Sequence, residues 1–230
     1  MNRHEFDQEL WERRLDLTAS AFPAPGDGPS AVRLAAAPVH MPSAHDQAGH
    51  ELALANALVL NAPTAALSLD LLVNEDELHP QGALVFACLL FLTGRAEGAQ
   101  FWWQYAAGSG NYTAAYCLHL FHLSLGETRD AEYWRSQAEH LVAHPRPVPA
   151  RRLRSPRPLL PADVRHDILD RCHQGLDPCL PTRVEAVINR LRHVEDAEFG
   201  EIPQPDRGLS GALTGPDDEP PAAGGTALPR

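Results

Sequence analysis

The chain has 230 residues, 44% of them hydrophobic, and a net charge of −11, which allows one sizeable domain with extensions. All of its 19 basic residues are arginines, so chemistry that needs lysine, such as a Schiff base or a Walker-type phosphate loop, is excluded. The acidic balance disfavours broad nucleic-acid binding, which requires a basic face that neutralises phosphates.

Segments rich in proline and glycine divide the chain, because such segments bury too little surface to offset the entropy of ordering. We predict an N-terminal amphipathic helix, a Pro/Gly-rich loop, a helical repeat domain, an Arg/Pro linker, a C-terminal helical hairpin and an acidic disordered tail. Their bounds are 1–18, 19–46, 47–143, 144–161, 162–196 and 197–230. Strand-type alternation is almost absent, so the expected fold class is all-α.

Targeting and redox signals are weak throughout the chain. The N-terminus has no apolar signal segment, and the longest apolar run, Ala83–Leu92, is about half of a membrane span. Four widely spaced cysteines do not form a disulfide framework. We therefore expect a reduced, cytoplasmic protein, and its Ala-, Pro- and Arg-rich composition is typical of a GC-rich bacterial genome.

Residues 47–143 predict three helix hairpins. Their helices are expected at Glu51–Leu60 with Thr64–Val73, Gln81–Leu92 with Ala96–Ala107, and Tyr112–Leu123 with Arg129–Val142. Pro63 interrupts the first hairpin, and Gly94 and Gly126 mark the turns of the other two. Asn111 or Thr113 can cap one helix, and Thr128 can cap the next.

Two of these hairpins repeat one pattern at a fixed offset of 32 residues. The matched positions are Gly94, Ala99, Trp102 and Ala106 in the first unit, and Gly126, Ala131, Trp134 and Ala138 in the second. Alanines let helix backbones approach closely, and a tryptophan one turn away fills the space between hairpins. A repeat of this length is typical of stacked helix hairpins, which present surfaces to partners.

The same region resembles Sel1-like repeats, which are relatives of tetratricopeptide repeats. The resemblance covers about residues 83–141 and depends on Trp103, Ala106-Ala107, Gly110-Asn111, Ala114, Tyr116, Leu118, Leu120 and Gly126. It implies a short array of helix hairpins, and Sel1-like proteins mostly act as adaptors in signalling or regulation. With two clear units, the 51–73 hairpin and the C-terminal helices would serve as caps.

A further pair of helices is expected at Ala162–Cys172 and Thr182–Val194. Thr182 and Glu185 have the spacing of a capping box, and Val184, Val187, Ile188, Leu191 and Val194 form one apolar stripe. The favoured interpretation is a hairpin that caps the repeat domain. The alternative is a helix-turn-helix, although the acids in its second helix are unusual for a recognition helix.

Candidate chemistry is sparse. His119 and His122, and likewise His140 and His144, have helical spacings that can direct two imidazoles at one ion, but we interpret them as structural. We predict no catalytic residues, no cofactor and no metal. Trp103 either fills a hairpin interface or anchors a partner. The candidate partner-binding residues are Trp103, Tyr105, His119 and His122.

These observations predict a non-enzymatic protein–protein interaction module, an adaptor or regulator in a bacterial regulatory pathway. Another protein or a peptide would lie in a groove lined by one helix of each hairpin. The alternative is a DNA-binding transcriptional regulator that uses the C-terminal hairpin. An enzyme is the least favoured class, because the chain shows no polar catalytic cluster. The oligomeric state stays open.

Overall fold

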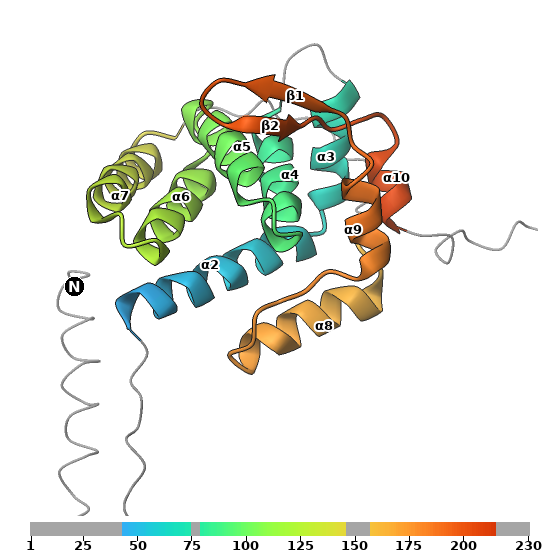
Figure 1. Cartoon of the computed structure of the whole chain (residues 1–230), viewed down its shortest axis with the longest axis horizontal. Coiled ribbons are helices and arrows are strands. Elements are labelled where there is room, and N and C mark those ends of the chain that lie inside the picture. Colours follow the sequence, from blue (N-terminus) through green and yellow to red (C-terminus); the bar gives the residue numbers. More distant parts are fainter. Residues whose placement is uncertain (1–42, 75–78, 146–156, 215–230) are drawn as a thin grey trace, which may run out of the picture. The chain divides into compact units, whose positions relative to one another are not determined.

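The computed structural model describes residues 43–74, 79–145 and 157–214; the predicted N-terminal helix, most of the first loop and residues 215–230 lie outside these ranges. The elements in chain order are α2 (Ala44–Asn61), α3 (Ala65–Asn74), α4 (Pro80–Leu92), α5 (Ala96–Gly108), α6 (Tyr112–Ser124), α7 (Thr128–Ala143), α8 (Ala162–His173), α9 (Thr182–Ile188), β1 (His193–Asp196), β2 (Gly200–Pro203) and α10 (Leu209–Thr214) (Figure 1). Within the described ranges, the strands form a single two-stranded sheet, so the all-α prediction is confirmed.

Helix α4 lies at the centre of the core. Every residue from Gly82 to Leu90 is buried, because α2, α3 and α5 all pack against this helix. A helix covered on all sides needs no polar face, which explains its unbroken apolar sequence. None of the helices in the described ranges is both long enough and apolar enough to cross a bilayer by itself.

Two consecutive hairpins, α4 with α5 and α6 with α7, follow the predicted plan. Each first helix is followed by a glycine with positive φ, 76° at Gly94 and 78° at Gly126. In both turns, the glycine and the residue after it donate backbone N–H groups to the last turn of the first helix. Glycine adopts this left-handed conformation without strain, so the two turns repeat at the 32-residue offset.

The predicted packing residues of the repeat line the interior. Ala99, Trp102, Ala106, Ala131 and Ala138 are buried, and Trp134 is partly buried against the core. Asn111 caps α6 as predicted, since its side chain accepts a hydrogen bond from the backbone N–H of Ala114 at 3.0 Å. The described chain is therefore helical with consecutive hairpin packing, which is compatible with a helical repeat fold.

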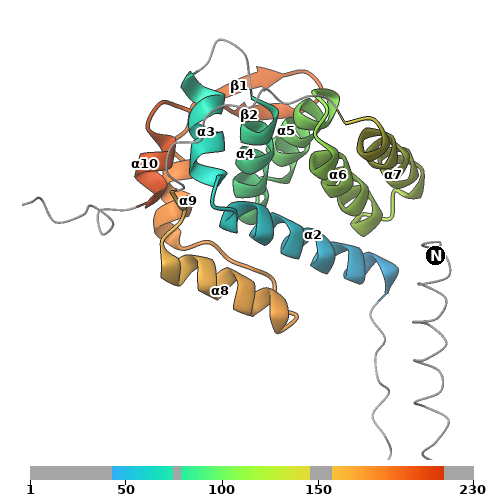
Figure 2. The same cartoon turned by 180° about the vertical axis from the view of Figure 1, so that it is seen from behind.

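The predicted first hairpin is wrong. Helices α2 and α3 are bent by 82° at the break before Ala65, so they meet nearly at a right angle. Helix α2 instead runs across α4, α6 and α8 (Figures 1 and 2). It also begins earlier than predicted, inside the expected loop, because Ser43 and Asp46 form a capping box at its N-terminus.

Three further predictions are wrong, two of them around the C-terminal helices. Leu159 and Leu160 were assigned to the linker, yet both are fully buried in the core. Thr182 is the first residue of α9, with Pro181 at the N-cap position, so the Thr182–Glu185 capping box does not form. Thr128 likewise begins α7 without capping it.

The segment from His193 to Thr214 differs most from the prediction. The expected helix 182–194 ends at Ile188, and strand β1 follows and pairs antiparallel with β2. The tail was predicted to be disordered from residue 197, but β2 packs on α5, and α10 packs on α3 and α9. Ile202, Leu209 and Leu213 are buried there. They lie among acids, glycines and prolines, so no local periodicity indicates that they reach a core.

Candidate functional site: the groove between α5 and α7

A hollow of about 360 Å³ lies between the end of α5 and the length of α7, and we call it the α5–α7 groove. It is lined by Ala107, Gly108, Tyr133, Trp134, Gln137, His140, Leu141 and His144. One helix of each hairpin contributes to it. Helix α7 lies at the opposite end of the described part from α8 and α10 in both views (Figures 1 and 2).

Side chains of α7 face either the core or the groove, according to their spacing along the helix. Ala131 and Ala138 are buried, whereas Trp134 is only partly buried and so also reaches the groove. Tyr133 is 56% exposed, and its ring meets the edge of the Trp134 ring at a centroid distance of 5.1 Å. The groove thus combines some apolar lining with an aromatic rim at Tyr133, which suits an apolar side chain from a partner.

Two stacked histidines form one end of the groove. The rings of His140 and His144 lie with centroids 4.5 Å apart. Nδ1 of His144 lies 3.1 Å from the carbonyl oxygen of His140. Since a carbonyl oxygen only accepts, Nδ1 of His144 donates this hydrogen bond. No carboxylate is among the residues that line the groove.

Two of the predicted partner-binding residues are turned towards the core, with Trp103 inside it and Tyr105 packed against it. Trp103 is fully buried, with its ring 5.4 Å from that of Phe91 and 5.9 Å from that of Phe121. Of the two roles left open for Trp103, it therefore fills the interface between the hairpins. Tyr105 is partly buried and packs against the core, where its ring meets Trp102 at 6.1 Å.

The two predicted histidines of α6 connect this helix to α7. Nδ1 of His119 donates to the carbonyl of Ala131 at 2.8 Å. His122 is buried, and its Nδ1 lies 2.6 Å from a carboxylate oxygen of Glu127. Neither residue lines the groove. The groove-lining residues of α7 were not predicted to bind a partner: Trp134 was assigned to repeat packing, and His140 and His144 were interpreted as structural.

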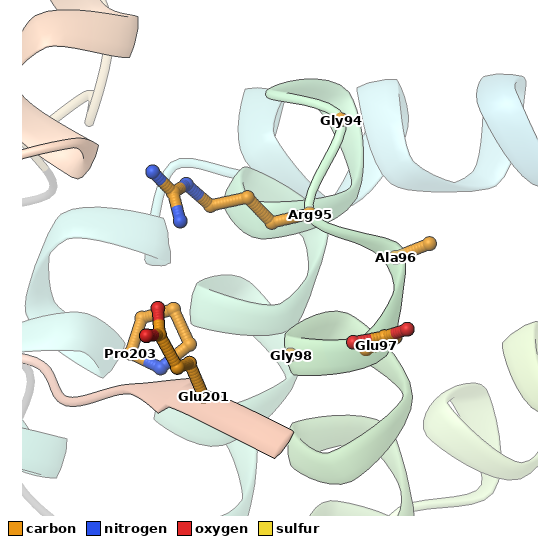
Figure 3. A pocket seen from close by; sticks show the side chains of 7 residues that line it. All are labelled: Gly94, Arg95, Ala96, Glu97, Gly98, Glu201 and Pro203. Carbon is orange, nitrogen blue, oxygen red and sulfur yellow. The ribbon is translucent and has the colours of Figure 1, made fainter. Parts of the chain in front are cut away.

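A second hollow, of about 480 Å³, lies where β2 crosses the start of α5 (Figure 3). Arg95 extends away from Glu97 there, and its guanidinium contacts Asn189 at 2.6 Å and His193 at 3.3 Å. The remaining charged groups are the carboxylates of Glu97 and Glu201. The lining residues therefore contain no pair of nucleophile and base, and the arginine is engaged by the chain itself.

Beside this hollow, β2 and α5 are in close contact. Nε1 of Trp102 donates to the carbonyl of Pro203 at 3.0 Å. A Cβ atom at Gly98 would lie 2.9 Å from Cδ of Pro203, so only glycine allows this approach. The strand β2, which lies in the predicted disordered tail, therefore covers part of α5. The helix expected at Thr182–Val194, which the DNA-binding alternative requires, is reduced to the seven residues of α9.

The interior thiols offer no nucleophile. Burial raises the pKa of Cys117 to about 12, and burial together with the neighbouring Cys117 raises the pKa of Cys88 well above its usual value. Both groups therefore stay protonated at neutral pH, and a protonated thiol is a poor nucleophile.

No protein-family model matches the chain, and comparisons with curated proteins and with solved structures found no match either.

Proposed function

We propose that the protein is a non-enzymatic interaction module, an adaptor or regulator of the Sel1-like, tetratricopeptide-like kind, that holds a peptide or a helix of a partner protein in the α5–α7 groove. The observation that carries the proposal is the groove itself, formed by one helix from each of two consecutive hairpins. Repeat arrays of this kind use such surfaces to bind extended or helical segments.

The chemistry of the groove supports an amphipathic occupant. Trp134, Leu141 and Ala107 offer apolar contacts, and Gln137 and the two histidines offer hydrogen bonds along one side. The volume of about 360 Å³ falls within the range of roughly 300–1,000 Å³ that is typical of ligand pockets. A partner segment with one large apolar side chain and flanking polar groups fits this lining.

Exposed aromatic residues gather on the same hairpin. Among the described residues, the tyrosines with more than 40% exposure are Tyr112, Tyr116 and Tyr133, and all three lie on α6 or α7. Leu125 and Val142 of this hairpin are also more than half exposed. Tyrosine is enriched at protein interfaces, because its ring gives contact area and its hydroxyl gives a hydrogen bond.

The test is a selection of random 12-residue peptides on the full-length chain, followed by affinity measurements on synthetic versions by fluorescence anisotropy. We expect Tyr133→Ala to weaken binding about tenfold or more, because rim aromatics are frequent hot spots. Leu176→Ala is the matched control, since Leu176 is 48% exposed outside the hairpins, and it should leave the affinity unchanged. Selected peptides that bind both variants equally well, or no enrichment at all, would contradict the proposal.

A further inference from the structure

Three ionisable side chains converge at the turn between α6 and α7. His122 comes from the last turn of α6, Glu127 directly precedes α7, and Asp130 lies in its first turn. One donor atom from each residue lies within 4.8 Å of the other two. We call this group the turn cluster. It belongs to neither the α5–α7 groove nor the hollow at β2.

The histidine of the turn cluster is not explained by packing. Its side chain is only 8% exposed, and Nδ1 points out of the core to Glu127 at 2.6 Å. Nε2 is buried without a hydrogen-bond partner among the described residues. The equivalent residue of the first hairpin, 32 positions earlier, is the buried Leu90. A polar ring in place of a leucine is unfavourable in a core unless the ring has a partner.

The two carboxylates gather more negative charge than one imidazole balances. Glu127 and Asp130 are both exposed. Within the described ranges, neither forms an ion pair with an arginine, and Glu127 pairs with His122. The N-terminus of α7 stabilises such charges in part. The open side of the cluster leaves room for water molecules as further ligands of a cation.

We infer that the turn cluster binds one divalent transition-metal ion of the zinc type, through Nδ1 of His122 and one oxygen each of Glu127 and Asp130. Zinc accepts nitrogen and carboxylate ligands together, whereas magnesium and calcium prefer all-oxygen sites. Ligation through Nδ1 moves the ring proton to Nε2, which lacks an acceptor among the described residues. The affinity is therefore lower than at structural zinc sites with four protein ligands.

The experiment is calorimetric titration of the full-length chain with zinc chloride, with magnesium chloride as the comparison. Every protein carries His140→Gln and His144→Gln, because that stacked pair could chelate zinc by itself. We expect one zinc ion per chain and no heat of binding with magnesium. His122→Leu should reduce zinc affinity at least tenfold while the chain stays folded, because leucine occupies the equivalent position 90.

A second pair of variants separates ligation from general charge. Asp130→Asn should reduce zinc affinity at least tenfold, whereas Asp163→Asn, at an exposed acid in the first turn of α8, should leave it unchanged. Circular dichroism confirms that each variant is folded. The inference is overturned if zinc does not bind the parent protein, or if His122→Leu and Asp130→Asn both bind zinc as the parent does.

Discussion

The two hairpins have the same construction but different surroundings. Helices α4 and α5 are enclosed by α2, α3, α6 and the C-terminal strand β2, whereas α6 and α7 form the end of the array, where most of α7 is exposed. Repeated residues at 32-residue spacing thus produce the same turn and the same buried alanines twice. The neighbours of each hairpin decide whether its outer positions become core or surface.

Equivalent positions at the two turns show this most clearly. Leu90, Arg95 and Gly98 of the first hairpin correspond to the three residues of the turn cluster. In the first hairpin, Pro203 packs on Gly98, and the C-terminal segment engages Arg95. In the second hairpin, the positions equivalent to Arg95 and Gly98 carry two exposed acids, Glu127 and Asp130. The first hairpin thus has a glycine and an arginine bonded within the chain where the second hairpin has two exposed acids.

The largest expected difference concerns the two repeated tryptophans. Trp102→Ala should lower the free energy of unfolding by roughly 3–5 kcal/mol, because Trp102 is 2% exposed and its loss also leaves the carbonyl of Pro203 unpaired. Trp134→Ala should lower it by less than about 2 kcal/mol, since Trp134 is only partly buried. Urea denaturation of both variants checks this. Equal losses would show that the second hairpin is as tightly packed as the first.

A smaller difference is expected at Gly82 and its equivalent, Ala114. A Cβ atom at Gly82 would collide with the carbonyl oxygen of Ser68 and would lie 2.6 Å from Cβ of Leu72, because α3 crosses α4 closely. Gly82→Ala should therefore destabilise the protein by about 1–3 kcal/mol, whereas the buried Ala114 shows that α6 already accommodates this methyl group.

The matched control for Gly82→Ala is Gly49→Ala in α2. The nearest atom to a Cβ at Gly49 is Cβ of Ser124 at 3.9 Å, an ordinary contact. Alanine should stabilise this helix by about 0.5–1 kcal/mol relative to glycine. Thermal and urea unfolding measure both changes. A stable Gly82→Ala variant would mean that α3 and α4 separate more easily than the structure indicates.

The inward faces of the two hairpins are expected to behave alike. Cys88 of α4 and Cys117 of α6 are both buried, and burial raises the pKa of each. A thiol reagent at pH 8 should therefore label the exposed Cys179 rapidly. The three buried thiols, those of Cys88, Cys117 and Cys172, should stay unmodified until urea unfolds the chain. Cys179→Ser should abolish the rapid phase, and rapid modification of a second thiol would show that the interior opens.

Local signals predicted two of the three hairpins expected in residues 47–143, those formed by α4 with α5 and by α6 with α7. Gly94 and Gly126 mark turns because a left-handed backbone conformation is a property of the residue itself. Asn111 caps α6 by a bond within its own turn. The capping box of α2 was also readable from Ser43 and Asp46, but the surrounding prolines led to the prediction of a loop there.

Long-range contacts account for what was missed. Trp134 marked α7 as part of the repeat, yet the sequence did not show that its neighbour Tyr133 lies on the rim of a groove. His122 was noticed with His119, whereas its partner in the structure is Glu127, across the turn. Periodicity assigns a residue to a face of one helix and does not indicate which other element meets that face.

The amino-acid order alone determined the helical class, the 32-residue hairpin unit and its turns, because these depend on bonds and contacts within a few residues. Tertiary packing decided the angle between α2 and α3, the strands and short helix of the C-terminal segment, and which hairpin is left open. The strands and the short helix depend on Ile202, Leu209 and Leu213 reaching the shared core, where β2 packs on the distant α5 and α10 packs on the distant α3 as well as on α9. Contacts of that range leave no periodic trace in the local sequence.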